Sequence, residues 1–233
     1  MPQLSIIIPV FNEVSTLSTV IDSVRSAKLP DIQIVVVDDF STDGTRELLQ
    51  GPLGDEIDLV VEHVKNRGKG AALRTGIKAA TGDYVVFQDA DLEYDPKDLL
   101  RMLEILKTGA VDVVYGSRFL NPNIRQISPF WHRVVNRGLT AYSNFYTGLK
   151  LTDMETCYKM FPREILQSIE LTEDRFGVEP ELTAKAAAKG LRFQEIPIEY
   201  NRRTFDEGKK IGARDGVRAL YVISKYGFVG SDS

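Results

Sequence analysis

Acidic residues stand at the ends of two predicted strands, in a pattern that suits a metal ion. They are Asp38 and Asp39 after residues 32–37, and Asp89, Asp91 and Glu93 after residues 84–88. Two carboxylates one residue apart can both turn toward one divalent cation, and Mg²⁺ or Mn²⁺ prefers oxygen ligands, with phosphate oxygens in the remaining positions. A lone Asp-x-Asp is more often a turn or capping pair. The second acidic strand end favours the metal interpretation here.

A basic, glycine-rich turn lies between these two acidic segments. Its sequence is Asn66-Arg67-Gly68-Lys69-Gly70, and it precedes a predicted helix. Glycine lets the backbone approach a phosphate closely, and the first turn of a helix favours negative charge. Lys69 adds a full positive charge. Such a turn is more often simply solvated, but its position between the acidic strand ends favours a phosphate site.

The elements that must position these residues alternate between strand and helix. Short runs rich in β-branched residues predict strands at residues 4–10, 32–37, 57–61, 84–88 and 111–115. Apolar residues at helical spacing predict helices at residues 14–24, 42–50, 69–80 and 96–107. This alternation is typical of an α/β fold with a mostly parallel central sheet flanked by helices. Ligands of such sheets bind at the carboxyl ends of the strands, where the acidic residues fall.

The rhythm changes after about residue 120. The elements expected there are a polar loop at 121–128, a helix at 129–147, a strand at 158–161, helices at 163–169 and 179–189, a strand at 193–200, a basic loop at 204–214 and a last helix at 216–226. No low-complexity linker or repeat divides the chain. We therefore expect one domain over residues 1–233, with a nucleotide-binding half up to about residue 120 and an acceptor-shaping half after it.

Composition narrows the class of protein. The 233 residues are 43% hydrophobic and carry a formal net charge of −4, which excludes a nucleic-acid binder that acts through overall positive charge. The one cysteine, Cys157, has no intrachain disulfide partner. The start lacks the basic region of a signal peptide, and no apolar run is long enough for a membrane span. We expect a cytoplasmic protein, with peripheral contact to the cytoplasmic face of a membrane at most.

Taken together, the motifs resemble those of family 2 glycosyltransferases of the GT-A fold. The closest resemblance is to the branch of dolichol-phosphate mannosyltransferases and related polyprenyl-phosphate glycosyltransferases. It covers nearly the whole chain. The matching segments are residues 9–13 (PVFNE), 37–39 (VDD) with 43–45 (DGT), 66–70 (NRGKG), 89–91 (DAD), 115–119 (YGSRF), 153–159 (DMETCYK), 200–203 (YNRR) and 207–211 (EGKKI).

The resemblance implies an inverting hexosyltransferase that uses a nucleotide diphosphate sugar of the GDP-mannose or UDP-glucose type. The acceptor it implies is a polyprenyl or dolichyl phosphate, and the cofactor Mg²⁺ or Mn²⁺. The implied donor-binding residues are Pro9, Phe11, Glu13, Asp39, Lys69, Asp89, Ala90 and Asp91, with Asp89, Asp91 and Glu93 on the metal. The implied acceptor-phosphate residues are Arg118, Arg133 or Arg137, Arg203 and Lys209. Asp89, Asp91, Arg118 and Arg203 would be the catalytic group.

Three other functions stay open. A relative acting on a hydroxyl acceptor needs a carboxylate base, for which the candidates are Asp153, Glu155, Glu179 and Glu181. A lipid phosphate needs none, because its oxygen is already anionic. A module that only binds nucleotide sugar and a nucleotidyltransferase are the others, although the latter would want a glycine-rich loop directly after the first strand. The two histidines, His63 and His132, lie in no matched motif, and we expect a surface or structural role for each.

The segment 130–146 mixes aromatic residues with Arg133 and Arg137. We formulate the hypothesis that it rests on a membrane interface and helps to load a lipid acceptor. The alternative is an ordinary core helix with solvated arginines.

Overall fold

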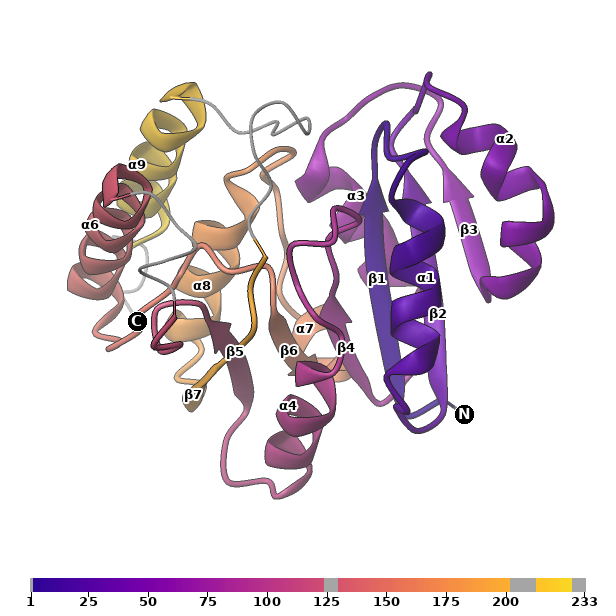
Figure 1. Cartoon of the computed structure of the whole chain (residues 1–233). Coiled ribbons are helices and arrows are strands. Elements are labelled where there is room, and N and C mark those ends of the chain that lie inside the picture. The colour runs from indigo at the N-terminus through magenta and orange to yellow at the C-terminus, as the bar shows by residue number, and fades with distance from the viewer. Residues whose placement is uncertain (1, 124–129, 202–212, 228–233) are drawn as a thin grey trace.

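In the computed structural model, which describes residues 2–123, 130–201 and 213–227, seven strands form one sheet (Figure 1). Their order is β3-β2-β1-β4-β6-β5-β7. Strand β6 is antiparallel to both neighbours, β4 and β5, and the other neighbouring pairs are parallel. The strands are β1 (Leu4–Val10), β2 (Ile32–Asp38), β3 (Leu59–Glu62), β4 (Tyr84–Phe87), β5 (Val113–Ser117), β6 (Lys159–Pro162) and β7 (Phe193–Pro197). The predicted mostly parallel sheet is confirmed.

Helices flank this sheet. They are α1 (Leu17–Ser26), α2 (Thr45–Gln50), the 3₁₀ helix η1 (Pro52–Glu56), α3 (Lys69–Ala79), α4 (Asp98–Lys107), α6 (Phe130–Thr147), α7 (Arg163–Gln167), α8 (Val178–Ala188) and α9 (Ala213–Gly227). Figure 1 shows α1 and α3 on opposite faces of the sheet, as right-handed crossovers in opposite directions require. Helix α6 packs against α8 and α9, and Figure 1 shows α6 and α9 side by side on the side of the molecule that carries β5 and β7.

The central strands are buried on both faces, which explains their continuous apolar sequences. In β1, the consecutive residues Ile6, Ile7 and Ile8 are fully buried although their side chains alternate between the two faces of the sheet. The same holds for residues 34–37 of β2. A sheet covered on both faces leaves its ends as the accessible surface, so the loops after β1, β2 and β4 become the place where a ligand can bind.

Several element boundaries differ from the predicted ones for local reasons. Helix α2 begins at Thr45 rather than Thr42, because Gly44 has a φ of 99° and Asp43 Oδ1 accepts the N–H of Thr45 at 3.1 Å. Strand β3 begins at Leu59, because Asp58 turns its carboxylate to the N–H of Ile34 at 2.8 Å. Strand β7 ends at Pro197, although the N–H of the next residue, Ile198, still donates to the carbonyl oxygen of Ser117 at 3.3 Å.

The two predicted halves share the sheet. Strand β6 comes from the second half, yet it lies between β4 and β5 of the first half. Most of the predicted basic loop at 204–214, and the end of the loop at 121–128, lie outside the described residues. Within the part of the chain that the structure describes, no helix is both long enough and apolar enough to cross a membrane.

Candidate functional site

Asp38 and Asp39, at the end of β2, have different roles. Asp38 is fully buried and accepts the Nε–H of Arg46 at 2.7 Å and the N–H of Ser41, so it fixes the loop after β2. The Asp39 carboxylate accepts the backbone N–H groups of Arg67 and Gly68 at 2.8 and 2.6 Å. Asp39 therefore ties the glycine-rich turn to the end of β2.

The glycine-rich turn has a backbone that only glycine can supply. Gly68 has a φ of 96°, and a Cβ atom there would lie 2.5 Å from the carbonyl oxygen of Asp174. At Gly70 a Cβ would meet the carbonyl oxygen of Glu173 at 2.1 Å. The segment before α8 therefore packs directly on this turn, and it limits where the next residue, Lys69, can point.

Lys69 points to two carboxylates. Its Nζ lies 2.8 Å from Asp89 Oδ1, at the end of β4, and 3.0 Å from Glu179 Oε1, on α8. Burial alone would lower the pKa of Lys69, but Asp89 and Glu179 hold it well above its ordinary value. Lys69 is therefore a permanent positive charge at the junction of the glycine-rich turn, β4 and α8.

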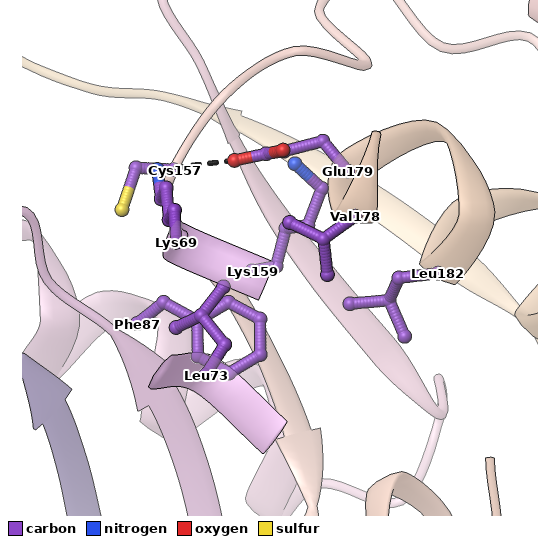
Figure 2. Close-up of a pocket in the computed structure, with 8 residues that line it drawn as sticks. All are labelled: Lys69, Leu73, Phe87, Cys157, Lys159, Val178, Glu179 and Leu182. Atoms are coloured by element: carbon purple, nitrogen blue, oxygen red, sulfur yellow. Dashed lines mark ion pairs between the residues drawn. The ribbon is translucent and has the colours of Figure 1, made fainter. Parts of the chain in front are cut away.

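A pocket lies beneath this ion pair. It is lined by Lys69, Leu73, Phe87, Cys157, Lys159, Val178, Glu179 and Leu182, and Figure 2 shows Lys69 and Glu179 directed toward each other above its apolar wall. Glu179 Oε2 is buried without a hydrogen-bond partner, and the buried Lys159 ammonium lies 4.9 Å from the centroid of the Tyr115 ring. The charged groups next to Asp89, which are Lys69, Glu179 and Lys159, are thus buried together.

The three predicted metal ligands are close in sequence and crowded in charge. Burial, then the charges of Asp89 and Glu93, raise the pKa of Asp91 to about 7. Asp91 Oδ1 accepts the N–H of Glu93 at 3.1 Å, while Glu93 Oε2 accepts the hydroxyl of Tyr200 at 2.7 Å. A cation would relieve the repulsion that holds a proton on Asp91.

Whether these residues suit a divalent cation can be judged from their oxygens. Among residues 2–123, 130–201 and 213–227, no three acidic, histidine or cysteine side chains converge as a complete metal centre. Mg²⁺ is usually held by one or two carboxylates together with substrate phosphates. Asp89 and Asp91 fit that smaller requirement. The role of Glu93 as a third ligand stays a prediction, since its carboxylate is held by Tyr200.

Arg118, one of the predicted acceptor residues, is held in one orientation. Its Nε and Nη2 each lie 2.7 Å from an oxygen of the fully buried Asp153, and its backbone N–H also donates to Asp153. Its guanidinium lies 5.2 Å from the centroid of the Tyr200 ring. Tyr200 therefore contacts Arg118 through its ring face and Glu93 through its hydroxyl, and one tyrosine side chain separates the acidic site from this arginine.

The other predicted acceptor residues differ in position. The guanidinium of Arg137 lies 5.4 Å from the Phe119 ring centroid, and that of Arg118 lies 6.0 Å from the same ring. Arg133 instead lies over Phe130, at 6.0 Å. Arg203 and Lys209 lie outside the described residues. Of the two arginines on α6, Arg137 is the one that shares an aromatic neighbour with Arg118.

Comparison with known proteins agrees with this geometry. The sequence profile described as "Glycosyl transferase family 2" matches residues 5–170. The chain belongs to glycosyl transferase family 2. It is therefore a glycosyltransferase, and a nucleotide-sugar site at the carboxyl ends of β1, β2 and β4 stays a prediction.

Individual relatives agree in sequence and in fold. This glycosyltransferase is 29% identical to polyprenol monophosphomannose synthase of Mycolicibacterium smegmatis, over 97% of its own length and 87% of that protein. It is 29% identical to undecaprenyl-phosphate mannosyltransferase of Micrococcus luteus, over 95% and 92%. Its fold matches glucosyl-3-phosphoglycerate synthase of Mycobacterium tuberculosis, solved with Mn²⁺ and UDP, with a TM-score of 0.72, 20% identity, and 97% and 80% of the two chains covered. The GT-A fold is confirmed.

The remaining residues predicted to bind the donor lie around the ends of β1 and β4. Pro9 is half-buried within β1, and Phe11 directly follows that strand. Glu13 is 8% exposed, and its Oε2 accepts the hydroxyl of Thr16 at 2.8 Å. Ala90 is buried between the two aspartates. Their contacts with a nucleotide stay predictions.

The structure also distinguishes the four candidate bases. Asp153 is saturated by Arg118. Glu181 accepts the backbone N–H groups of Thr172 and Glu173 and pairs with Lys185 at 2.7 Å, so it is structural. Glu179 is paired with Lys69. Among the described residues, Glu155 is paired with no cation in this way: its Oε1, like Oε2 of Glu179, is buried without a hydrogen-bond partner, and burial followed by the charge of Glu179 raises its pKa to about 7.

The contacts of two residues beside the candidate site were not predicted from the sequence. Tyr200 belongs to a matched segment, but nothing in its type or spacing indicates that it joins Glu93 to Arg118. His63 was expected to be a surface or structural residue, and it is buried with both ring nitrogens in hydrogen-bond contact. These contacts join residues far apart in the chain, so no local pattern predicts them.

Proposed function

We propose that this glycosyltransferase transfers a hexose, with inversion, from a nucleotide diphosphate sugar of the GDP-mannose or UDP-glucose type to a polyprenyl or dolichyl phosphate. The observation that carries the proposal is the position of Tyr200. Its hydroxyl donates to Glu93 on the acidic side, and its ring lies 5.2 Å from the Arg118 guanidinium on the basic side. A donor diphosphate at the acidic side and an acceptor phosphate at the arginine would be neighbours.

On the donor side, the chain supplies fixed charges and backbone groups. Lys69 lies on Asp89, where it would meet a diphosphate oxygen. The start of α3 directs N–H groups and a partial positive charge toward the same region. Asp89 and Asp91 would hold Mg²⁺ or Mn²⁺, which supplies charge stabilisation to the departing nucleotide diphosphate.

On the acceptor side, Arg118 is the residue best prepared to meet an anion. Asp153 orients its guanidinium through two hydrogen bonds of 2.7 Å, so little side-chain freedom is lost on binding. Arg137, which shares the Phe119 ring with Arg118, is our choice for the second arginine. Arg203 and Lys209 complete the predicted group. A phosphate oxygen is already anionic, so it needs orientation rather than a base.

An apolar surface beside this region supports a lipid acceptor. On α6, the side chains of Phe130, Trp131, Val134, Val135 and Phe145 are exposed, and on α9 those of Val217, Leu220 and Tyr221 are exposed. Helices α6 and α9 pack side by side (Figure 1). Residues 130–147 contain no aspartate or glutamate, which suits an anionic lipid surface. We propose that this α6–α9 surface rests on the membrane that holds the acceptor.

One observation favours a second function, transfer to a hydroxyl acceptor. Glu155 has a buried carboxylate oxygen without a hydrogen-bond partner and a pKa raised to about 7 by burial and by Glu179. A carboxyl group with these properties is suited to general-base chemistry near neutral pH. Under the main proposal, Glu155 has no part in the reaction.

The test supplies labelled GDP-mannose or UDP-glucose, Mn²⁺ and undecaprenyl or dolichyl phosphate in detergent. We expect label to enter the organic phase, to be lost on chelation with EDTA and to return with Mn²⁺ or Mg²⁺. Glycan and small-molecule hydroxyl acceptors are assayed in parallel. Label that enters only the hydroxyl acceptors, in a reaction that Glu155→Gln abolishes, would replace the lipid-phosphate proposal by the second function.

A further inference from the structure

His63 directly follows β3, and its ring bridges two elements of the donor side. The residue is 7% exposed. Its Nδ1 lies 2.7 Å from Asp39 Oδ1, at the end of β2, and its Nε2 lies 2.9 Å from Thr75 Oγ1, on α3. Thr75 in turn donates to the carbonyl oxygen of Ala71 within the same helix, at 3.1 Å. The imidazole therefore has a partner on each side.

The backbone of His63 is fixed as well. Its N–H donates to the carbonyl oxygen of Asp38 at 2.8 Å, and its own carbonyl oxygen accepts Arg46 Nη2 at 2.5 Å. Arg46 also pairs with the Asp38 carboxylate at 2.7 Å. Both the backbone N–H and the backbone carbonyl of His63 are therefore hydrogen-bonded, and its ring has little freedom to move away from Asp39.

Asp39 receives three donors. Its Oδ1 accepts the N–H of Arg67 at 2.8 Å as well as the His63 ring, and its Oδ2 accepts the N–H of Gly68 at 2.6 Å. An ionised carboxylate only accepts hydrogen bonds, so His63 donates from Nδ1. Without that bond, the carboxylate would accept only the two backbone N–H groups of the turn, those of Arg67 and Gly68.

We infer that His63 is a positioning residue of the donor site. It fixes the Asp39 carboxylate, Asp39 fixes the turn through Arg67 and Gly68, and the turn delivers Lys69 to Asp89. The inference rests on the proposed donor function of this turn. It assigns His63 an effect on nucleotide affinity, and none on the acceptor side, where Arg118 is held by other residues.

Three substitutions separate positioning from a merely structural role. His63→Ala removes the Nδ1 donor, and the loss of one hydrogen bond to a charged group predicts binding weaker by about tenfold. Asparagine can place its side-chain N–H₂ near the position of Nδ1, so His63→Asn should bind within about threefold of the wild type. Thr75→Val removes only the partner of Nε2 and should also stay within about threefold.

The experiment titrates GDP and UDP, each with Mn²⁺, into the folded wild type and the variants by calorimetry, and measures donor and acceptor KM in the transfer assay. We expect His63→Ala to raise the nucleotide Kd and the donor KM about tenfold, to leave the acceptor KM unchanged, and to be rescued by asparagine. In the background of Asp39→Ala, His63→Ala should have no further effect on Kd, because the two residues act through one contact.

The opposing outcomes are distinct. A lower melting temperature with an unchanged Kd in His63→Ala would make the residue structural only and overturn the inference. An equal rise in donor and acceptor KM, or no rescue by asparagine, would overturn it too. Failure of the wild type to bind either nucleotide would overturn the proposed donor function itself, and the inference with it.

Discussion

The glycine-rich turn at residues 66–70 and the α6–α9 surface differ in how their side chains find partners. At the glycine-rich turn, polar groups are paired with one another: Asp39 accepts three N–H groups, and Lys69 contacts two carboxylates. On the α6–α9 surface, large apolar side chains face solvent, with Trp131 73% exposed and Phe145 79% exposed. One region has its partners within the fold, and the other presents a surface that the described residues leave uncovered.

The difference teaches what kind of ligand each region suits. A turn fixed by buried hydrogen bonds presents few alternative geometries, and it suits a small polar ligand such as a nucleotide diphosphate. An apolar surface with arginines at its side suits a ligand with a charged head and a long apolar body. Arg137 lies on α6 itself and shares the Phe119 ring with Arg118, so it joins the two regions.

The largest effect is expected at the carboxylates of the donor side. Asp91→Ala should lower transfer by at least about a thousandfold, since a metal ion contributes several kcal/mol to charge stabilisation. The fold should persist, as judged by circular dichroism and melting temperature. The matched control is Asp22→Ala, at an exposed position of α1, which should keep full activity. Full activity in Asp91→Ala would end the metal argument.

A second test concerns the pKa of Glu155, the candidate base of the hydroxyl-acceptor function. Burial and Glu179 raise its pKa to about 7 from an ordinary 4.5. The unfolded chain releases this proton near pH 4.5, whereas the folded chain keeps it up to about pH 7. Stability from this group therefore falls as pH rises between these values, by an amount on the order of 2 kcal/mol.

Glutamine at position 155 does not titrate. Relative to the wild type, Glu155→Gln should therefore gain on the order of 2 kcal/mol of unfolding free energy between pH 5 and pH 8, as measured by urea denaturation at both pH values. Glu104→Gln, at an exposed position of α4, should show no such gain. Parallel pH curves for wild type and Glu155→Gln would refute the raised pKa. Retained transfer in Glu155→Gln is expected under the lipid-phosphate proposal.

The choice between two arginines sharpens the acceptor side of the comparison. Arg137→Ala should raise the acceptor KM about tenfold and leave the donor KM unchanged, because it removes one charged contact to a phosphate. Arg133→Ala is the matched control on the same helix, since its guanidinium lies over Phe130 rather than Phe119. It should change the acceptor KM by less than about threefold. The reverse ranking of the two variants would exchange their roles.

The alternating strands and the acidic strand ends could be predicted from sequence because they are local patterns. Residues 6–10 and 34–37 are apolar without interruption, and carboxylates follow the strands at Asp39 and Asp89. The antiparallel insertion of β6 between β4 and β5 could not be predicted in this way. The sequence of its four residues does not indicate the direction of the strand or which strands it pairs with. These depend on how the second half of the chain packs.

Within the site, charge type was predictable but pairing was not. Lys69 was recognisable as a phosphate-binding candidate from the glycine-rich turn, yet its partner Glu179 lies far away in sequence on α8. Asp153 and Glu181 were plausible bases by residue type alone. Their hydrogen bonds to Arg118 and to the segment before α8 assign them structural roles. Such assignments depend on contacts between distant segments, which a single sequence does not display.

The smallest effect, and the most direct test of the exposed region, concerns Trp131. It is the only tryptophan of the chain and is 73% exposed on α6. Its fluorescence should shift to the blue when vesicles containing anionic lipid are added, because the indole ring would leave water for the interface. Trp131→Ser should weaken vesicle binding about fivefold, measured by flotation, since roughly 1 kcal/mol of apolar burial is lost.

The control is Val64→Ser, which removes an 89% exposed apolar side chain after β3, away from α6 and α9, and should bind as the wild type does. Equal binding by both variants, or no spectral shift, would show that the apolar side chains of α6 do not meet the membrane, and the contrast between the two regions would then need another partner to explain it.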